Sequence, residues 1–166
     1  MSRKTRWFLF TLLAVVALDQ ATKLWISSNL ELWRGHIDVI PGFFQLVHYQ
    51  NKGAVGGILG DSEFRIPIFI AFTVVALGAM VAMVRKLEPI ERFVPFVLGM
   101  IAGGAIGNAI DRALYGAVFD FILLHITTPN ITFRWYVFNL ADVAIVAGVI
   151  GLIYEVVFGR NAVKAP

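Results

Sequence analysis

Four aspartates lie in or beside long apolar stretches of this chain: Asp19, Asp111, Asp120 and Asp142. An ionised carboxylate at the centre of a bilayer costs about 3 kcal/mol even on lenient scales, so acids retained in such stretches are candidates for function. Two carboxylates that share a proton hydrolyse peptide bonds, because the ionised one takes a proton from water while the protonated one polarises the scissile carbonyl. Proton relays and ion sites use the same groups, so the acids alone leave both chemistries open.

Two of the acids follow an asparagine by three residues. Asn108 precedes Asp111, and Asn139 precedes Asp142. Residues i and i+3 share a helix face, so each asparagine is expected to stand beside its own acid and offer amide donors to a carboxylate or a substrate backbone. Arg112 follows Asp111 directly, and its fork of donors would hold that acid ionised or clamp a peptide carbonyl. The two segments therefore predict a polar site.

The composition excludes several other chemistries. The chain has no cysteine, which excludes a thiol nucleophile, a disulfide scaffold and a thiolate metal site. Its three histidines include no H-x-x-x-H pair, so a zinc hydrolase is not expected. Of its 166 residues 58% are hydrophobic and 15% charged, which indicates a protein surrounded mostly by lipid.

The apolar stretches are long enough to span a membrane, because about 20 helical residues cross roughly 30 Å of hydrocarbon. We expect a single-domain, all-α membrane protein over residues 1–166. Its four transmembrane helices are expected at 7–28, 66–84, 93–112 and 138–158. The basic start resembles a signal peptide, but the apolar run continues past Asp19 without a small-x-small site, so this span is expected to stay uncleaved.

Basic residues predict the orientation, because lysine and arginine accumulate in cytoplasmic segments. Eight of the fourteen lie before the first span, between the second and third, or after the fourth: Arg3, Lys4, Arg6, Arg85, Lys86, Arg92, Arg160 and Lys164. With four spans these segments share one side, so both termini are expected in the cytoplasm. The formal charge of +3 then reflects topology and not a nucleic-acid site.

The segments 29–65 and 113–137 are expected on the extracytoplasmic side, where the four acids also gather. The first contains β-like stretches, 37–40 and 43–49, broken by Pro41-Gly42 and followed by a glycine cluster. Its aromatic residues favour the membrane–water interface. We therefore expect a small sheet at the membrane surface.

Five motifs, in order along nearly the whole chain, resemble those of the lipoprotein signal peptidases, also called signal peptidase II. They are Asp19-Gln20-Ala21-Thr22-Lys23, Asn51-Lys52-Gly53-Ala54, the ten residues from Gly103 to Arg112, Asp120-Phe121-Ile122, and Phe138-Asn139-Leu140-Ala141-Asp142. The resemblance implies four helices with cytoplasmic termini, a small extracytoplasmic β-cradle, and an active site at the outer leaflet of the bacterial inner membrane. It implies an aspartic endopeptidase that cleaves diacylglyceryl-modified prolipoproteins just before the lipidated cysteine.

The resemblance also implies a role for each matching position. The catalytic dyad is Asp120 and Asp142. The residues that contact substrate or inhibitor are Asn51, Gly104, Asn108, Arg112 and Asn139, and the supporting residues are Asp19, Lys23, Asp111 and Ala141. The implied enzyme uses no cofactor or metal and is a monomer that binds no nucleic acid. Its implied partners are prolipoproteins, membrane lipid and cyclic-peptide inhibitors such as globomycin.

Some positions depart from the family pattern. The chain has Val55-Gly56 where N-x-G-A is usually followed by alanine and an aromatic residue, and Phe119 where a valine often precedes the catalytic aspartate. Val143 replaces the usual serine or threonine, and residues 127–132 form an extra stretch. These departures concern the lid and substrate preference.

The residues leave two alternatives for the polar site. Asp111 is a rival of Asp120, since its N-x-x-D-R setting mirrors that of Asp142; an ion pair with Arg112 would make Asp111 structural, which favours Asp120. Asp19 and Lys23, which lie at i and i+4 on one helix, are expected to neutralise each other. The alternative is that they contact a lipid headgroup or a loop directly.

Three further alternatives concern function. Lys23 and Ser27 lie one helical turn apart, as in serine–lysine peptidases, but no oxyanion hole is evident near the serine. His125 is expected to be an interfacial hydrogen-bonding residue and not a general base. A channel or proton-coupled transporter would use the acids as a relay, although no inverted repeat is evident.

Overall fold

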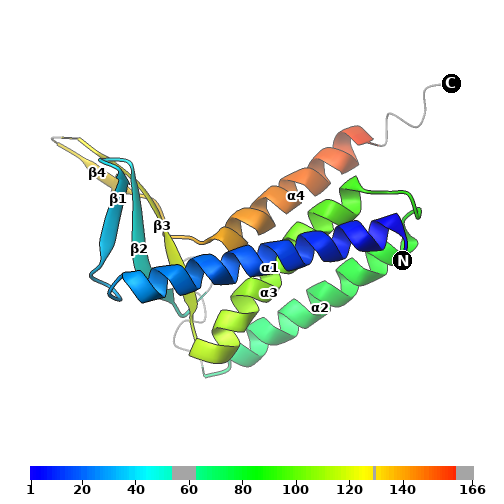
Figure 1. The fold of residues 1–166 in the computed structure, drawn as a ribbon, viewed down its shortest axis with the longest axis horizontal. Helices are drawn as coiled ribbons and strands as arrows, with labels where there is room; N and C mark the ends of the chain where they lie inside the picture. The colour runs from blue at the N-terminus through cyan, green and yellow to red at the C-terminus, as the bar shows by residue number, and fades with distance from the viewer. Residues whose placement is uncertain (54–62, 129, 160–166) are drawn as a thin grey trace.

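The computed structural model describes residues 1–53, 63–128 and 130–159. Its elements are α1 (Arg3–Asn29), β1 (His36–Ile40), β2 (Phe44–Asn51), α2 (Arg65–Lys86), α3 (Phe93–Tyr115), β3 (Val118–Thr127), β4 (Thr132–Arg134) and α4 (Leu140–Phe158). The four helices run side by side and the strands gather at one end of them (Figure 1). The sheet thus forms an end piece on a helical bundle.

Within the part of the chain that the structure describes, four helices are long and apolar enough to cross a membrane, as expected. Each overlaps its expected range and differs from it by a few residues at the ends. Large apolar side chains point away from the bundle, among them Phe72 and Val75 of α2, which are 74% and 71% exposed. Such a surface is unfavourable in water and suits a lipid environment.

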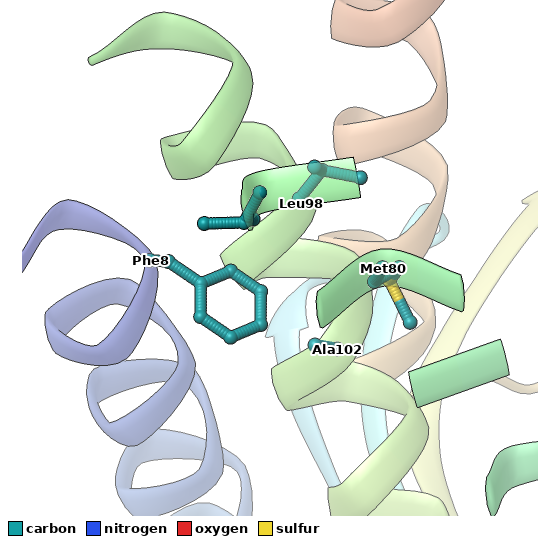
Figure 2. Packing of buried hydrophobic residues seen from close by; sticks show 5 residues of the cluster. Phe8, Met80, Leu98 and Ala102 are labelled. Carbon is teal, nitrogen blue, oxygen red and sulfur yellow. The ribbon is translucent and has the colours of Figure 1, made fainter. Parts of the chain in front are cut away.

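Helix α3 lies at the centre of the bundle and contacts each of the other three helices. Away from the sheet it packs through an apolar cluster: Phe8 from α1, Met80 and Val84 from α2, and Leu98 and Ala102 from α3. Figure 2 shows the Phe8 ring between α1 and the Leu98 side of α3. Apolar packing therefore holds one half of the bundle, and a different kind of contact is needed near the sheet.

Glycines bring α3 close to its neighbours in that second half. A Cβ on Gly103 would lie 2.8 Å from the Leu12 carbonyl oxygen of α1, and one on Gly104 would collide with the Ala141 carbonyl oxygen of α4. Small residues let helix backbones approach in membranes, where no hydrophobic effect drives helices together. Gly103 and Gly104 therefore allow α3 to pack closely against α1 and α4.

The strands form one antiparallel sheet in the order β1-β2-β3-β4. The two strands expected in residues 29–65 are confirmed as β1 and β2. No strand was expected in residues 113–137, but they contain β3 and β4. Strand β3 pairs with both β2 and β4 and is largely buried. A strand buried on both faces has a nearly continuous apolar sequence, and it lacks the alternation of apolar and polar residues that marks a half-exposed strand.

Two short connections fasten β3 to the bundle. Helix α3 ends at Gly116, whose φ of 71° is the left-handed conformation that glycine adopts easily, and whose N–H donates to the Arg112 carbonyl oxygen. Only Ala117 separates this cap from β3. On the other side, the N–H groups of Phe121 and Ile122 donate to the Phe138 carbonyl oxygen, directly before α4. The start of α4 is thereby held against β3.

We predict that Gly104→Ala lowers the free energy of unfolding in detergent by about 1–3 kcal/mol, because the added Cβ overpacks the contact between α3 and α4. Gly78→Ala is the matched control, since a Cβ there meets no atom within 4 Å and alanine is the better helix former. Thermal unfolding of both variants checks this. Equal effects of the two substitutions would contradict the packing role of Gly104.

Candidate active site

Asn139 and Asp142 begin α4 with a reciprocal capping box. The Asn139 side chain accepts from the Asp142 N–H at 3.0 Å, and the Asp142 Oδ2 accepts from the Asn139 N–H at 3.2 Å. The pattern satisfies backbone donors that the first turn of a helix leaves open. The expectation that this asparagine stands beside its own acid is confirmed, and the cap fixes the Asp142 carboxylate at the end of α4 nearest the sheet.

The side-chain amide of Asn139 also reaches the second acid of the expected dyad. Its Nδ2 donates to Asp120 Oδ1 at 2.7 Å, so Asn139 contacts both Asp120 and Asp142. Asn51, the last residue of β2, donates from Nδ2 to Asp120 Oδ2 at 3.2 Å. Its own Oδ1 accepts from the Gly53 N–H at 3.1 Å, a contact of an asparagine with the backbone two residues on that is common in turns. Both Asp120 oxygens are thus held by asparagine amides.

The expectation for Asn108 is wrong in its partner. Asn108 Nδ2 donates across the bundle to Asp142 Oδ1 at 2.8 Å, and not to Asp111 of its own helix. Asn108 Oδ1 accepts from Asn139 Nδ2 at 3.1 Å. The physical reason is the close approach of α3 and α4, which brings the start of α4 within reach of the α3 amide. Two asparagines therefore bridge the helices and the two acids.

The Asp120 carboxyl is buried, with 4% of the residue exposed. Burial raises the pKa of Asp120 to about 6, and the negative charge of Asp142 adds to the effect, while the amides of Asn51 and Asn139 act in the opposite direction. A carboxyl with such a pKa holds a proton more readily than an exposed aspartate. The two acids are thus suited to share one proton.

Lys23, Asp19 and Asp111 form a second cluster of charged residues, which contacts Asn108 of the first site through Lys23. Lys23 Nζ pairs with Asp19 Oδ2 at 2.8 Å and with Asp111 Oδ2 at 2.7 Å, and the side chains of all three are at most 2% exposed. The expected pair of Asp19 and Lys23 is confirmed. The expected ion pair of Asp111 with Arg112 is wrong, because the lysine of α1 takes that place. Asp111 thus pairs with a lysine of another helix and not with its neighbouring arginine, and its structural role stays a prediction.

Asp111 has no oxygen left for chemistry at the dyad. Its Oδ1 accepts from Gln20 Nε2 at 3.0 Å, and its Oδ2 accepts from the Phe119 N–H at 3.2 Å in addition to Lys23. Gln20 was missed as a site residue, although it lies three positions before Lys23 and so shares its helix face. These contacts favour Asp120 over Asp111 as the partner of Asp142.

Arg112 lies half-buried at the end of α3. Its guanidinium carbon is 4.4 Å from the centre of the Phe69 ring, and its Nη1 donates to the Asn108 carbonyl oxygen at 3.3 Å. Within the described residues its buried Nε has no hydrogen-bond partner. A guanidinium with an unused donor near two carboxylates is suited to bind a carbonyl group of a ligand.

Gly104 of α3 lies directly against the Ala141 carbonyl of α4, and neither residue presents a polar side chain. The Ala141 N–H donates to Asp19 Oδ1 at 3.0 Å, which links α4 to the charged cluster of α1. Gly104 lies in the same packing contact, where a side chain would push α4 and its acid away.

The serine–lysine alternative does not fit the geometry. All three protons of the Lys23 ammonium are used by oxygens of Asp19, Asp111 and Asn108, so this lysine is no free base. Ser27 is exposed and donates to the Leu24 carbonyl oxygen.

The histidine on β3 is also distant from the dyad. His125 lies five residues beyond Asp120 along β3, which is about 16 Å on an extended strand. It is 8% exposed, and its role as an interfacial hydrogen-bonding residue stays a prediction. Packing of β3 between its two neighbours buries it. Among the described residues, no group of three or more His, Cys, Asp or Glu side chains is arranged to hold a metal ion.

Some sequence departures lie outside the site or outside the described residues. Val143 is 42% exposed on α4. The extra stretch 127–132 joins β3 to β4, and Thr128 Oγ1 there donates to the Ile131 carbonyl oxygen. Residues 54–56, which carry the departure near Asn51, and the glycine cluster that follows lie outside the described residues.

Comparison with known proteins identifies the family. Residues 11–158 match the family model described as Signal peptidase (SPase) II. A lipoprotein signal peptidase of Rhodopseudomonas palustris (strain TIE-1) is 43% identical over 159 residues, which is 95% of this chain and 96% of the relative. A lipoprotein signal peptidase of Nitrobacter hamburgensis is 45% identical over 157 residues, or 92% of this chain and 94% of the relative.

Solved structures show the same fold. A bacterial membrane enzyme determined by the in meso method at 1.9 Å resolution matches with a TM-score of 0.78 and 30% identity, covering 91% of this chain and 92% of that chain. Another, determined by the same method at 2.3 Å resolution, matches with a TM-score of 0.77 and 28% identity, covering 95% of this chain and 91% of that chain. With the five motifs and the matched residues, these likenesses show that the chain belongs to the signal peptidase II family of lipoprotein signal peptidases.

Proposed function

We propose that this chain removes signal peptides from diacylglyceryl-modified prolipoproteins, with Asp120 and Asp142 as its catalytic dyad. The family comprises aspartic proteases that process prolipoproteins, and family membership favours hydrolysis over a proton relay or channel. The cut just before the lipidated cysteine is the family's cleavage position. The observation that carries the assignment is the bridge through Asn139, whose side chain donates to Asp120 while its backbone N–H donates to Asp142.

Hydrolysis follows from two carboxyl groups that share one proton. The ionised carboxylate takes a proton from water, and the water oxygen attacks the carbonyl carbon of the scissile bond. The protonated acid donates to the carbonyl oxygen as the tetrahedral intermediate forms. The carboxyl that took the proton from water then gives it to the leaving nitrogen, while the other carboxylate takes a proton from a hydroxyl of the intermediate. The C–N bond breaks, a carboxyl group forms on the signal peptide, and the lipidated cysteine becomes a new N-terminus. The raised pKa of Asp120 supports Asp120 as the acid that carries the proton.

Four polar residues around the dyad are proposed to bind the substrate backbone: Asn51, Asn108, Arg112 and Asn139. The three asparagines already hold the carboxylates, so a peptide bound beside them is aligned with the reacting groups. Arg112 keeps an unused donor for a peptide carbonyl. Gly104 is proposed to act beside them by letting α4 approach α3. Cyclic peptides such as globomycin are proposed to occupy the same site.

The proposed setting is a single membrane-embedded domain of a monomer in the bacterial inner membrane, with cytoplasmic termini and the dyad at the extracytoplasmic side. The contact of Lys4 Nζ with the Arg85 carbonyl oxygen at 2.8 Å supports a shared side for the N-terminus and the α2–α3 link, both rich in basic residues. The acids cluster at the opposite end with the sheet. Membrane lipid and the lipid anchor of the substrate keep the scissile bond at that depth.

We predict that Asp120→Asn and Asp142→Asn each abolish cleavage, a loss of at least about a thousandfold, because either change removes one of two groups that act as a unit. The measurement is the gel shift of a lipidated prolipoprotein incubated with purified protein in detergent. Full activity of the Asp120 variant would overturn the assignment.

Asp111→Asn is the matched control, since Asp111 is a buried carboxylate of the same bundle that binds Lys23, Gln20 and a backbone N–H. It is expected to lower stability and leave measurable turnover, because Asp19 still neutralises the lysine. Complete loss of turnover in a folded Asp111 variant would contradict the separation of the two clusters.

Asp120→Asn is also expected to change how stability depends on pH. The pKa of Asp120 is raised from 3.8 to about 6, so the folded state binds this proton more tightly than the unfolded state. Stability therefore falls as pH rises through this window, by up to about 3 kcal/mol for the native chain, and the asparagine variant lacks this loss. The melting temperature of the variant relative to the native chain should rise between about pH 4 and pH 7. A difference independent of pH would contradict the buried, proton-holding state of Asp120.

A further inference from the structure

Lys23 contacts three oxygens from three different residues. Its Nζ lies 2.8 Å from Asp19 Oδ2, 2.7 Å from Asp111 Oδ2 and 3.0 Å from Asn108 Oδ1, and the residue is 2% exposed. An ammonium has three donors and no acceptor, so each proton has one partner. Two of these partners neutralise charge. The third is an uncharged amide that belongs to the dyad's own hydrogen bonds.

We propose that Lys23 is a positioning residue for the dyad, which orients the amides of Asn108 and Asn139 so that both donate to the catalytic carboxylates. The proposal rests on the proposed function of Asp120 and Asp142. An asparagine amide has nearly the same shape in its two flipped orientations, and only its neighbours decide which end carries the donors. A lysine ammonium beside the amide can only donate, so it fixes the orientation in which the amide oxygen faces the lysine.

The orientation passes from Lys23 to both acids. With Asn108 Oδ1 facing the ammonium, Asn108 Nδ2 faces Asp142 Oδ1, to which it donates at 2.8 Å. The same Asn108 oxygen accepts from Asn139 Nδ2 at 3.1 Å. The other proton of Asn139 Nδ2 then points to Asp120 Oδ1 at 2.7 Å. The Lys23 ammonium therefore orients two asparagine amides, one of which donates to Asp142 and the other to Asp120.

The positive charge of Lys23 also favours the ionised form of the dyad. The charged groups around the dyad are Asp19 and Lys23 on α1, and Asp111 and Arg112 on α3. Burial is the largest influence on the pKa of Asp120 and raises it, while the positive charge of Lys23 opposes that rise. Without the lysine, two buried carboxylates would stand unneutralised behind the dyad. The dyad would then hold its protons to higher pH.

The test compares Lys23→Met, which keeps the length of the side chain and removes its donors and charge, with Asp19→Asn. The readouts are kcat, KM and the pH dependence of kcat for cleavage of a lipidated prolipoprotein by the full chain in detergent. Lys23→Met should lower kcat about a hundredfold, leave KM nearly unchanged and move the pH profile upward. Asp19→Asn keeps the contact of Lys23 with Asn108 and an acceptor for the Ala141 N–H, so it should lower stability; because it removes a negative charge, it should move the pH profile downward, opposite to Lys23→Met.

A double variant separates positioning from neutralisation. Lys23→Met alone leaves two buried carboxylates, Asp19 and Asp111, without their cation. Asp19→Asn combined with Lys23→Met leaves only Asp111 ionised, so the cluster keeps the net charge that its two acids and one lysine have in the native chain. If Lys23 positions Asn108, this folded variant still has the low kcat. A native kcat in the double variant, or an unshifted pH profile in Lys23→Met, would overturn the proposal. Activity of Asp142→Asn would instead refute the dyad itself, so the two failures are distinguishable.

Discussion

The site depends on one residue, Asn139, which belongs to a helix cap and to a pair of acids at once. As N-cap of α4 it exchanges two hydrogen bonds with Asp142, and through its amide it holds Asp120 of β3. A helix cap is a rigid feature, because its partners are fixed by the first helical turn. The cap at the start of α4 therefore fixes where the carboxylate of Asp142 lies relative to that of Asp120 on β3.

The rest of the fold brings that cap to its place. The left-handed Gly116 turns the chain from α3 directly into β3, and the Phe138 carbonyl oxygen ties the start of α4 to the same strand. Gly104 permits α4 to lie against α3, so that Asn108 reaches Asp142. Lys23 of α1 pairs with two buried acids, Asp19 and Asp111, in a setting where lipid offers no hydrogen bonds. These buried charges are tolerated because their polar atoms bind one another and the neighbouring amides.

The helices and the residues of the site were largely predictable from the sequence, and their partners were not. Apolar runs are set by the thickness of the bilayer, so their positions follow from composition alone. The spacing of Asn139 and Asp142 predicted their contact because both lie on one helical turn. The same spacing in Asn108 and Asp111 predicted the wrong partner for Asn108, and the sequence neighbour Arg112 was the wrong cation for Asp111. Both side chains bind residues of other helices, and the spacing within one helix does not determine how two helices are rotated or how closely they pack. Strand β3 was missed because a doubly paired strand has no alternating pattern.

The central claim is that Asp120 and Asp142 act as one unit joined by Asn139. Cleavage rates of Asp120→Asn, Asp142→Asn and the double variant, measured on one lipidated prolipoprotein at one pH, test it most directly. Groups that act as a unit show non-additive losses. The account predicts that the double variant is no slower than either single variant. A double variant whose loss equals the product of the two single losses would show independent roles and contradict the dyad.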